Sequence, residues 1–228
     1  QEVVAQNSGI TVLSGNERFI AFREAAYKLQ LKDQQRVLET FNTHFDVWTS
    51  EKSLHTSGAV NRGFEKLKSQ GHMFVEEGAT WLRTSDFDDD KDRVLIKADG
   101  ALTYFASDTA YYVDKRNRGY DLCIYLLGAD HHGYVNRLRA VAACAGDNPD
   151  KNVEVLIGQL VKMLKNGQEV RLSKRAGNII TLEDLVEEVG TDAARYTLTR
   201  YPVDTPLTLE IDLLTSHTND NPVFYVQY

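Results

Sequence analysis

The sequence predicts an α/β protein with a parallel sheet. Leu122 to Leu127 is an unbroken apolar run of strand length, and Val153 to Ile157 is a second one. Between them, His132 to Ala145 has the pattern of a helix and ends before Gly146. Apolar strands that alternate with helices are typical of parallel sheets covered on both faces. We therefore expect a β–α–β unit whose strands are buried on both sides.

Length and composition fit one large globular domain, or a domain with an insertion. The 228 residues are 42% hydrophobic and carry a formal charge of -7. Such a balance argues against a polybasic nucleic-acid binder, because affinity for a phosphate backbone comes from clustered Lys and Arg. No run of 18 apolar residues and no signal-peptide pattern occurs in the sequence, so we expect a cytoplasmic protein without a membrane span. Its two cysteines lack zinc-ligand spacing.

Residues 1–90 are expected to hold helices and short strands. Apolar spacing from Glu17 to Phe41 indicates two helices, and Phe45 to Trp48 has the composition of a short strand. Three further elements follow: a helix after Ser57-Gly58 that stops at Gly71, and short strands at Met73 to Glu76 and at Thr80 to Arg83.

A charged run separates this part from the α/β part. Asp86 to Asp92 holds five aspartates and is expected to be a solvated loop. Arg93 to Lys97 and Ala101 to Phe105 flank Asp99-Gly100, which predicts a hairpin. Ser107 is expected to cap a helix that runs to about Lys115. Near the C-terminus, Thr181 with Asp184 resembles a capping box at the start of a helix. Gly190 is expected to separate that helix from a second one.

A cluster of cations lies between glycines near residue 170. Arg171, Lys174 and Arg175 fall within five positions, with Ser173 among them. Lys and Arg donate charge-assisted hydrogen bonds to phosphate oxygens, and the glycines would let the loop close over a triphosphate. From composition alone, a solvated basic turn is the alternative.

A second group of polar residues follows the first apolar strand. Open parallel sheets bind ligands at the carboxyl ends of their strands. Gly128 would allow a close backbone approach there, and Asp130 could accept hydrogen bonds from ribose hydroxyls. The alternative for Asp130 is a cap on the following helix. His131 and His132 lack a third ligand at suitable spacing, so no metal site is expected.

A third group combines Tyr104 and Asp108, with a tyrosine expected at a strand end and an aspartate at a helix start. Side chains in these places could converge at the mouth of one pocket. In the alternative interpretation, Asp108 complements the helix dipole and Tyr104 packs on the strand.

The cation cluster resembles the KMSKS loop of class I aminoacyl-tRNA synthetases in the form KMSKRxGN. Arg171 stands for the first Lys, Leu172 for Met and Arg175 for the final Ser, while Ser173 and Lys174 are retained. The resemblance implies that Lys174 stabilises charge on the phosphates of ATP, with help from Arg171 and Ser173. Gly128 and Asp130 look like the Gly-x-Asp element that holds the nucleoside in this class.

Further residues make the chain similar to arginyl-tRNA synthetases. They are the run Thr103 to Tyr112 together with Asp92 to Leu95, Lys115, Arg118-Gly119, Asp121 and Gly190 to Tyr196. The resemblance implies that Asp108 pairs with the guanidinium of L-arginine and that Tyr104 forms a wall and a hydroxyl partner. It also implies that His131 contacts the amino acid.

The resemblance also implies an organisation. Residues 91–200 would form the second half of a Rossmann-like nucleotide-binding fold, preceded in 1–90 by an α+β insertion and followed in 201–228 by the connection to an anticodon-binding domain. The sequence has no HIGH element, which the family uses on ATP phosphates. We therefore expect a fragment of the catalytic domain that is inactive in isolation.

The implied activity is that of an arginine–tRNA ligase acting on L-arginine, ATP as its Mg²⁺ complex and tRNA(Arg), as a monomer and without a tightly bound metal. Two alternatives stay open. One is another class I adenylate-forming synthetase, and the other is a non-catalytic synthetase-like module that binds RNA.

Overall fold

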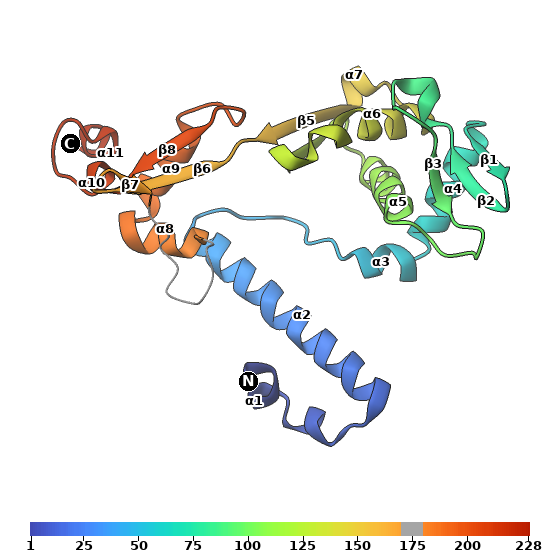
Figure 1. The fold of residues 1–228 in the computed structure, drawn as a ribbon, viewed down its shortest axis with the longest axis horizontal. Helices are drawn as coiled ribbons and strands as arrows, with labels where there is room; N and C mark the ends of the chain where they lie inside the picture. The colour runs from blue at the N-terminus through green and yellow to red at the C-terminus, as the bar shows by residue number, and fades with distance from the viewer. Residues whose placement is uncertain (170–179) are drawn as a thin grey trace. The chain divides into compact units, whose positions relative to one another are not determined.

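A computed structural model describes residues 1–169 and 180–228 (Figure 1). Contacts within the chain define two units. The first unit comprises residues 1–46, 162–201 and 208–228, and the second comprises 47–161 and 202–207. The expected segments 1–90, 91–200 and 201–228 divide the chain by family organisation and not by contacts. They therefore stay predictions.

The second unit contains the predicted β–α–β arrangement. Strands β4 (Cys123–Gly128) and β5 (Val153–Gly158) are parallel, and their register runs from Cys123 opposite Val153 to Gly128 opposite Gly158. The connection between them consists of η3 (Ala129–Tyr134), α6 (Val135–Cys144) and α7 (Pro149–Asn152). Parallel strands need such a crossover. The parallel α/β prediction is therefore confirmed.

One face of β4 corrects the expectation of a strand buried on both sides. Cys123 is 6% exposed, whereas Ile124 and Leu126 are 55% and 68% exposed. Side chains of a strand alternate between the two faces of the sheet. Only one face of β4 is therefore packed against the core of the described residues, and an unbroken apolar run could not reveal this difference.

In the second unit, α5 (Tyr104–Asn117) contacts β4, and α3 (Glu51–Thr56) and α4 (Ala59–Ser69) pack against α5. Gly63 allows α4 and α5 to approach closely, since a Cβ atom there would lie 3.0 Å from Ala110 Cα. The core of the unit consists mainly of these buried side chains: Leu67, Leu82, Leu95, Phe105, Tyr112, Val113, Val141, Cys144 and Val153. The position of α5 is thus fixed by core packing along one of its faces.

An antiparallel sheet precedes α5. It consists of β1 (Met73–Glu76), β2 (Ala79–Leu82) and β3 (Arg93–Ile96), which confirms these predicted strands. The predicted hairpin turn at Asp99-Gly100 is present, and the N–H of Lys97 donates to the Ala101 carbonyl at 2.8 Å. Its second arm is shorter than the expected strand at 101–105, because only a bridge joins Leu102 to Ile96 before the helix begins at Tyr104. Thr103 then caps α5, its Oγ1 accepting the N–H of Ala106 at 3.2 Å. Tyr104 therefore opens the helix, and Ser107 lies inside it rather than capping it.

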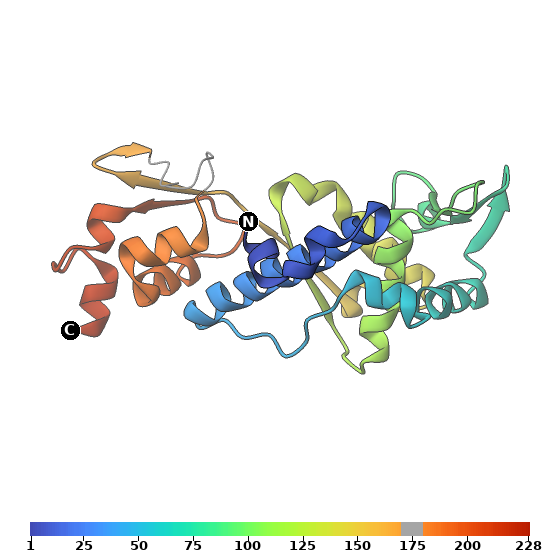
Figure 2. The same cartoon turned by 90° about the horizontal axis from the view of Figure 1, so that it is seen from below.

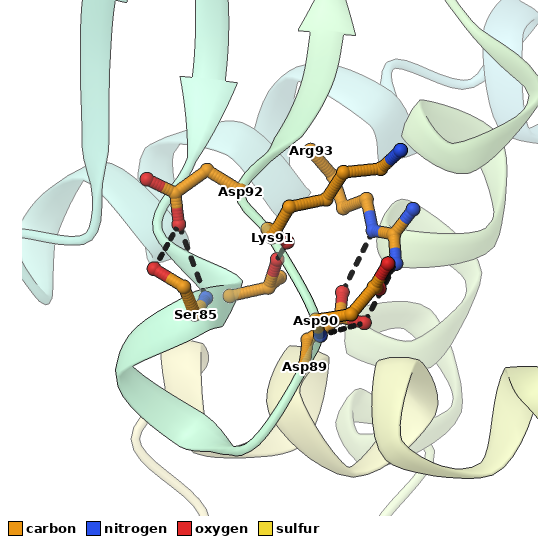
Figure 3. Close-up of polar contacts among 7 residues, drawn as sticks. Ser85, Asp89, Asp90, Lys91, Asp92 and Arg93 are labelled. Carbon is orange, nitrogen blue, oxygen red and sulfur yellow. Dashed lines mark hydrogen bonds and ion pairs between the residues drawn. The ribbon is translucent and has the colours of Figure 1, made fainter.

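The aspartate run is only partly solvated, and Figure 3 shows its polar contacts with Ser85 and Arg93. Asp89 is 8% exposed and accepts two hydrogen bonds from Arg93, Nε to Oδ2 at 2.8 Å and Nη2 to Oδ1 at 2.7 Å. Asp92 accepts hydrogen bonds from the N–H and the hydroxyl of Ser85, at 3.0 and 2.7 Å. These contacts close the segment containing η2 (Thr84–Phe87) onto β3. The prediction of a fully solvated loop was therefore wrong.

The Asp89 pair leads to a stability prediction. Burial acts to raise the pKa of Asp89, but hydrogen bonds from Arg93 and from the N–H of Asp90 bring it down to about 2, from 3.8. A depressed carboxyl pKa stabilises the fold above pH ~3.8 and loses this effect as the pH falls towards 2. We expect Asp89→Asn to lower the free energy of unfolding by about 2 kcal/mol at pH 7, measured by chemical denaturation.

The exposed neighbour Asp88 provides the control, since Asp88 has φ +65° and asparagine tolerates that conformation. Asp88→Asn should leave the unfolding free energy nearly unchanged. The Asp89→Asn deficit should shrink between pH 4 and pH 2. A deficit that stayed constant over this range would show that the charge of Asp89 is not its cause.

The first unit contains the long helix α2 (Gly15–Thr40), which follows α1 (Glu2–Gln6) and η1 (Ser8–Val12). Figures 1 and 2 show α2 as one uninterrupted helix, so the prediction of two helices was wrong. No Gly or Pro lies between residues 16 and 40 to interrupt it. No strand is present at Phe45 to Trp48, which corrects that expectation as well.

The rest of the first unit surrounds two short helices. Helices α8 (Leu182–Val189) and α9 (Thr191–Thr199) are separated by Gly190, and the Thr181–Asp184 capping box is present, as predicted. Arg195 of α9 donates hydrogen bonds to the carbonyls of Phe41 and Asn42, at 2.7 and 2.9 Å, and so satisfies the end of α2. The unpredicted elements are β6 (Val161–Lys165), β7 (Gln168–Glu169), β8 (Leu207–Glu210), α10 (Ile211–Leu214) and α11 (Pro222–Gln227). Among the described residues, every helix is too short or too polar to cross a membrane.

Candidate active site

Helix α5 presents a row of polar and aromatic side chains. Tyr104, Asp108, Tyr111 and Lys115 are spaced by four, three and four residues, which places them along one face of the helix. The N-terminal part of this row, from Tyr104 to Tyr111, lines a cavity of about 250 Å³. Its lining residues are Thr49, Glu51, Leu54, Tyr104, Ser107, Asp108 and Tyr111. The structure thus brings the predicted pair Tyr104 and Asp108 together at one cavity.

Asp108 is the partly buried carboxylate of this cavity. It lies in the second turn of α5 and is not a first-turn acid, so the alternative of a dipole-complementing aspartate is not favoured. Burial, and then the nearby Glu51, raise the pKa of Asp108, while Arg137, Lys115 and Tyr134 act in the opposite direction. A partly desolvated carboxylate gains most by pairing with a cation.

Glu51 is a second carboxylate at this cavity that the sequence interpretation missed. It opens helix α3 and lies 57 positions before Asp108. Nothing in the spacing of the sequence links the two residues, because α3 meets α5 only through tertiary packing. The cavity therefore offers two carboxylates and two tyrosines, with Tyr104 87% exposed at its edge. That exposure corrects the alternative in which Tyr104 packs on a strand.

Hydrogen bonds hold the cavity walls in place. His55 Nε2 lies 3.2 Å from Ser107 Oγ and joins α3 to α5. Arg118 Nη2 donates to Thr49 Oγ1 at 3.0 Å and to Asp114 at 2.8 Å. The residues that line the cavity are therefore connected to the body of α5 rather than carried by a free loop.

The end of β4 forms a second polar region in the same unit. A Cβ atom at Gly128 would lie 2.8 Å from Asp130 Oδ1, so glycine is needed for the aspartate to fold back on the strand end. Asp130 caps no helix, because neither η3 nor α6 has a side-chain cap. Its side chain is 82% exposed and lies 3.6 Å from His131 Nε2. The carboxylate is available for a ligand at the strand end.

Tyr134 lies close to both His131 and Asp108. The His131 and Tyr134 rings meet edge to face, with centroids 6.1 Å apart, and Arg137 lies 4.3 Å over the Tyr134 ring. Tyr134 also acts to lower the pKa of Asp108. His131 itself is not among the residues that line the 250 Å³ cavity. The predicted site residues Tyr104, Asp108, Gly128, Asp130 and His131 all belong to the second unit.

The remaining predicted site residues cannot be placed. Arg171, Ser173 and Lys174 of the predicted phosphate loop lie outside the described residues. Within residues 1–169 and 180–228, no group of three or more His, Cys, Asp or Glu side chains is arranged to hold a metal ion.

The fold places the chain among class I aminoacyl-tRNA synthetases. A solved protein from Campylobacter jejuni, assigned as an arginyl-tRNA synthetase, superposes with a TM-score of 0.88 at 36% identity, covering 100% of this chain and 49% of that one. The arginyl-tRNA synthetase of Thermus thermophilus superposes with a TM-score of 0.67 at 14% identity, covering 93% of this chain and 46% of that one, and so supports the fold alone.

Sequence comparison narrows the class. Residues 3–201 match the model of the class I tRNA synthetase (R) catalytic domain. The arginine–tRNA ligase of Micrococcus luteus is 61% identical over 206 residues, and that of Paenarthrobacter aurescens is 56% identical over 227. The chain belongs to the arginyl-tRNA synthetase catalytic-domain family. Its matches cover 90% and 100% of this chain but only 36% and 41% of those two relatives.

Proposed function

We propose that this chain forms the arginine-binding and phosphate-contacting half of an arginine–tRNA ligase active site. The observation that carries the proposal is the cavity on α5, which Asp108 and Glu51 line together with Tyr104 and Tyr111. A guanidinium has five N–H donors in a plane, and all of them need partners once water is removed. Two carboxylates and a phenol hydroxyl supply such acceptors, and the aromatic rings offer faces on which the guanidinium can stack.

The reaction that this site would serve has two steps. A carboxylate oxygen of L-arginine attacks the α-phosphorus of ATP, the bond to the bridging oxygen breaks, and pyrophosphate leaves. A terminal ribose hydroxyl of tRNA(Arg) then attacks the arginyl carbonyl, and AMP leaves. The first nucleophile is already ionised at neutral pH, so positioning and charge neutralisation are the main requirements.

ATP would enter as its Mg²⁺ complex, a substrate rather than a resident metal. We propose that Asp130 accepts hydrogen bonds from the ribose hydroxyls at the end of β4, where Gly128 keeps the backbone accessible. Lys174, assisted by Arg171 and Ser173, would neutralise charge on the phosphates. His131, beside Asp130, would contact the amino-acid end of the substrate.

The remaining expectations belong to the same proposal. The working enzyme would be cytoplasmic and monomeric and would bind tRNA(Arg). Its membership of a tRNA synthetase family supports the binding of tRNA.

An exchange assay tests the proposal. This chain would replace the matching segment of the Micrococcus luteus relative, to which it is 61% identical. We expect this chimera to catalyse ATP–pyrophosphate exchange with L-arginine, and not with L-lysine or L-citrulline. Exchange with another amino acid would favour a different class I synthetase. A folded chimera that binds no nucleotide and gives no exchange would favour a non-catalytic module.

The 228-residue chain alone should behave differently. Its sequence has no HIGH element to hold the ATP phosphates. We expect no arginine-dependent exchange above the background without enzyme, under conditions in which the chimera is active. Robust exchange by the isolated chain would contradict the proposal that it supplies only part of the catalytic site.

A further inference from the structure

A lysine lies in the row of side chains on α5, just beyond the cavity. Lys115 is half-buried, and its Nζ lies 4.2 Å from the centroid of the Tyr111 ring and 4.0 Å from that of Tyr125 on β4. Both distances are within the range of a cation–π contact. The ammonium therefore joins a ring of the cavity wall to the strand that ends at Gly128.

We propose that Lys115 is a positioning residue for arginine binding, which fixes the Tyr111 ring as a rigid wall of the cavity by holding it against Tyr125. This inference rests on the proposed function for the identity of the ligand. Lys115 itself is not a residue that lines the cavity, and so it acts through Tyr111.

Three observations support this role. Tyr111 lies between Asp108 and Lys115 in the α5 row, so the three side chains share one face of the helix. The Arg118 guanidinium carbon also lies 5.5 Å from the Tyr111 centroid, so a second cation lies near the ring. The site is costly for an ammonium, because burial lowers the pKa of Lys115. A residue needed only to fill this space would not have to carry a charge.

The sign of the effect distinguishes positioning from simple electrostatics. A positive charge near the cavity repels a cationic ligand, so charge alone predicts that Lys115→Met would tighten arginine binding. A freed wall predicts weaker binding. In the chimera we expect Lys115→Met to raise the KM for L-arginine roughly 5- to 20-fold, with the KM for ATP unchanged within about twofold. Lys115→Arg keeps a cation over both rings and should restore most of the loss.

A double-mutant cycle tests the route through the tyrosine. Tyr111→Leu removes the ring, and Lys115→Met should then raise the KM for arginine no further on that background. Lys68→Met, at an exposed lysine of α4 in the same unit, is the matched control and should change neither KM. Thermal melting of each variant verifies folding, and the Arg variant carries the test if the Met variant unfolds.

The outcomes separate the two proposals. If the parent chimera gives no arginine-dependent exchange, the proposed function fails, and this inference fails with it. If the parent is active, tighter or unchanged arginine binding in a folded Lys115→Met variant overturns the role of Lys115 alone. Additive effects of the Tyr111 and Lys115 substitutions, or an Arg variant as weak as the Met variant, would overturn it too.

Discussion

Asp108→Ala in the chimera is expected to raise the KM for L-arginine by a factor between roughly 30 and several thousand. The KM for ATP should change little. Removing one partner of a desolvated charge pair typically costs about 2–5 kcal/mol. Asp108 is the partly buried carboxylate of the cavity, and burial already raises its pKa. The substrate guanidinium would lose its main counter-charge. Exchange kinetics with each substrate varied in turn measure the effect.

Asp121 provides the control for this prediction. It is an exposed aspartate of the same unit and does not line the cavity. Asp121→Ala should leave both KM values within about twofold of the parent. Equal and small effects of Asp108→Ala on arginine and ATP would remove Asp108 from the arginine site.

Lys174→Ala is expected to lower the kcat of exchange by roughly 100- to 1000-fold, with a smaller effect on the KM for arginine. Groups that stabilise charge developing in the transition state contribute on this scale. Lys174 lies outside the described residues, so this prediction rests on its place in the KMSKS-like loop. Single-turnover formation of arginyl-adenylate measures the chemical step directly.

Lys151→Ala, at an exposed lysine of α7, controls for the loss of one positive charge. It should leave kcat unchanged. A Lys174→Ala variant with normal kcat and a raised KM for ATP would assign Lys174 to ground-state binding only, because uniform binding lowers KM without raising kcat.

The sequence was sufficient for elements specified by local chemistry. The parallel strands, the Thr181–Asp184 capping box and the glycine between α8 and α9 were all predicted and are all present. Each depends on side chains within a few residues of one another. The α5 start was misplaced because both Thr103 and Ser107 are acceptable caps; in the structure Thr103 accepts the N–H of Ala106, whereas Ser107 contacts His55.

Features that depend on tertiary packing were not predictable. Asp89 looked like one of five solvated acids, and although Arg93 is only four residues away, the buried position of their ion pair depends on how the segment packs. Glu51 joins the cavity only because α3 packs against α5. The second cation–π contact of Lys115 needs Tyr125 of β4, which reaches Lys115 only once β4 packs beside α5. One sequence gives no signal for pairs of this kind, because no local pattern records them.

The candidate site also contains one part that the sequence predicted and one part that it did not. Tyr104 and Asp108 are one helical turn apart, so the predicted pairing at one pocket mouth needed only α5 to form. Their second carboxylate, Glu51, required the tertiary fold. The family resemblance supplied roles for these residues, and the cavity supplies the geometry that supports them.

The location of bound arginine tests the central claim most directly. All residues of the α5 cavity lie in the second unit, so the 228-residue chain contains the whole cavity. With ¹³C-labelled L-arginine at millimolar concentration, filtered nuclear Overhauser spectra should show contacts from the arginine side chain to the ring protons of Tyr104 and Tyr111, and Asp108→Ala should abolish them. Contacts to Phe224, at a separate cavity of about 510 Å³, without any to Tyr104 or Tyr111 would contradict the account.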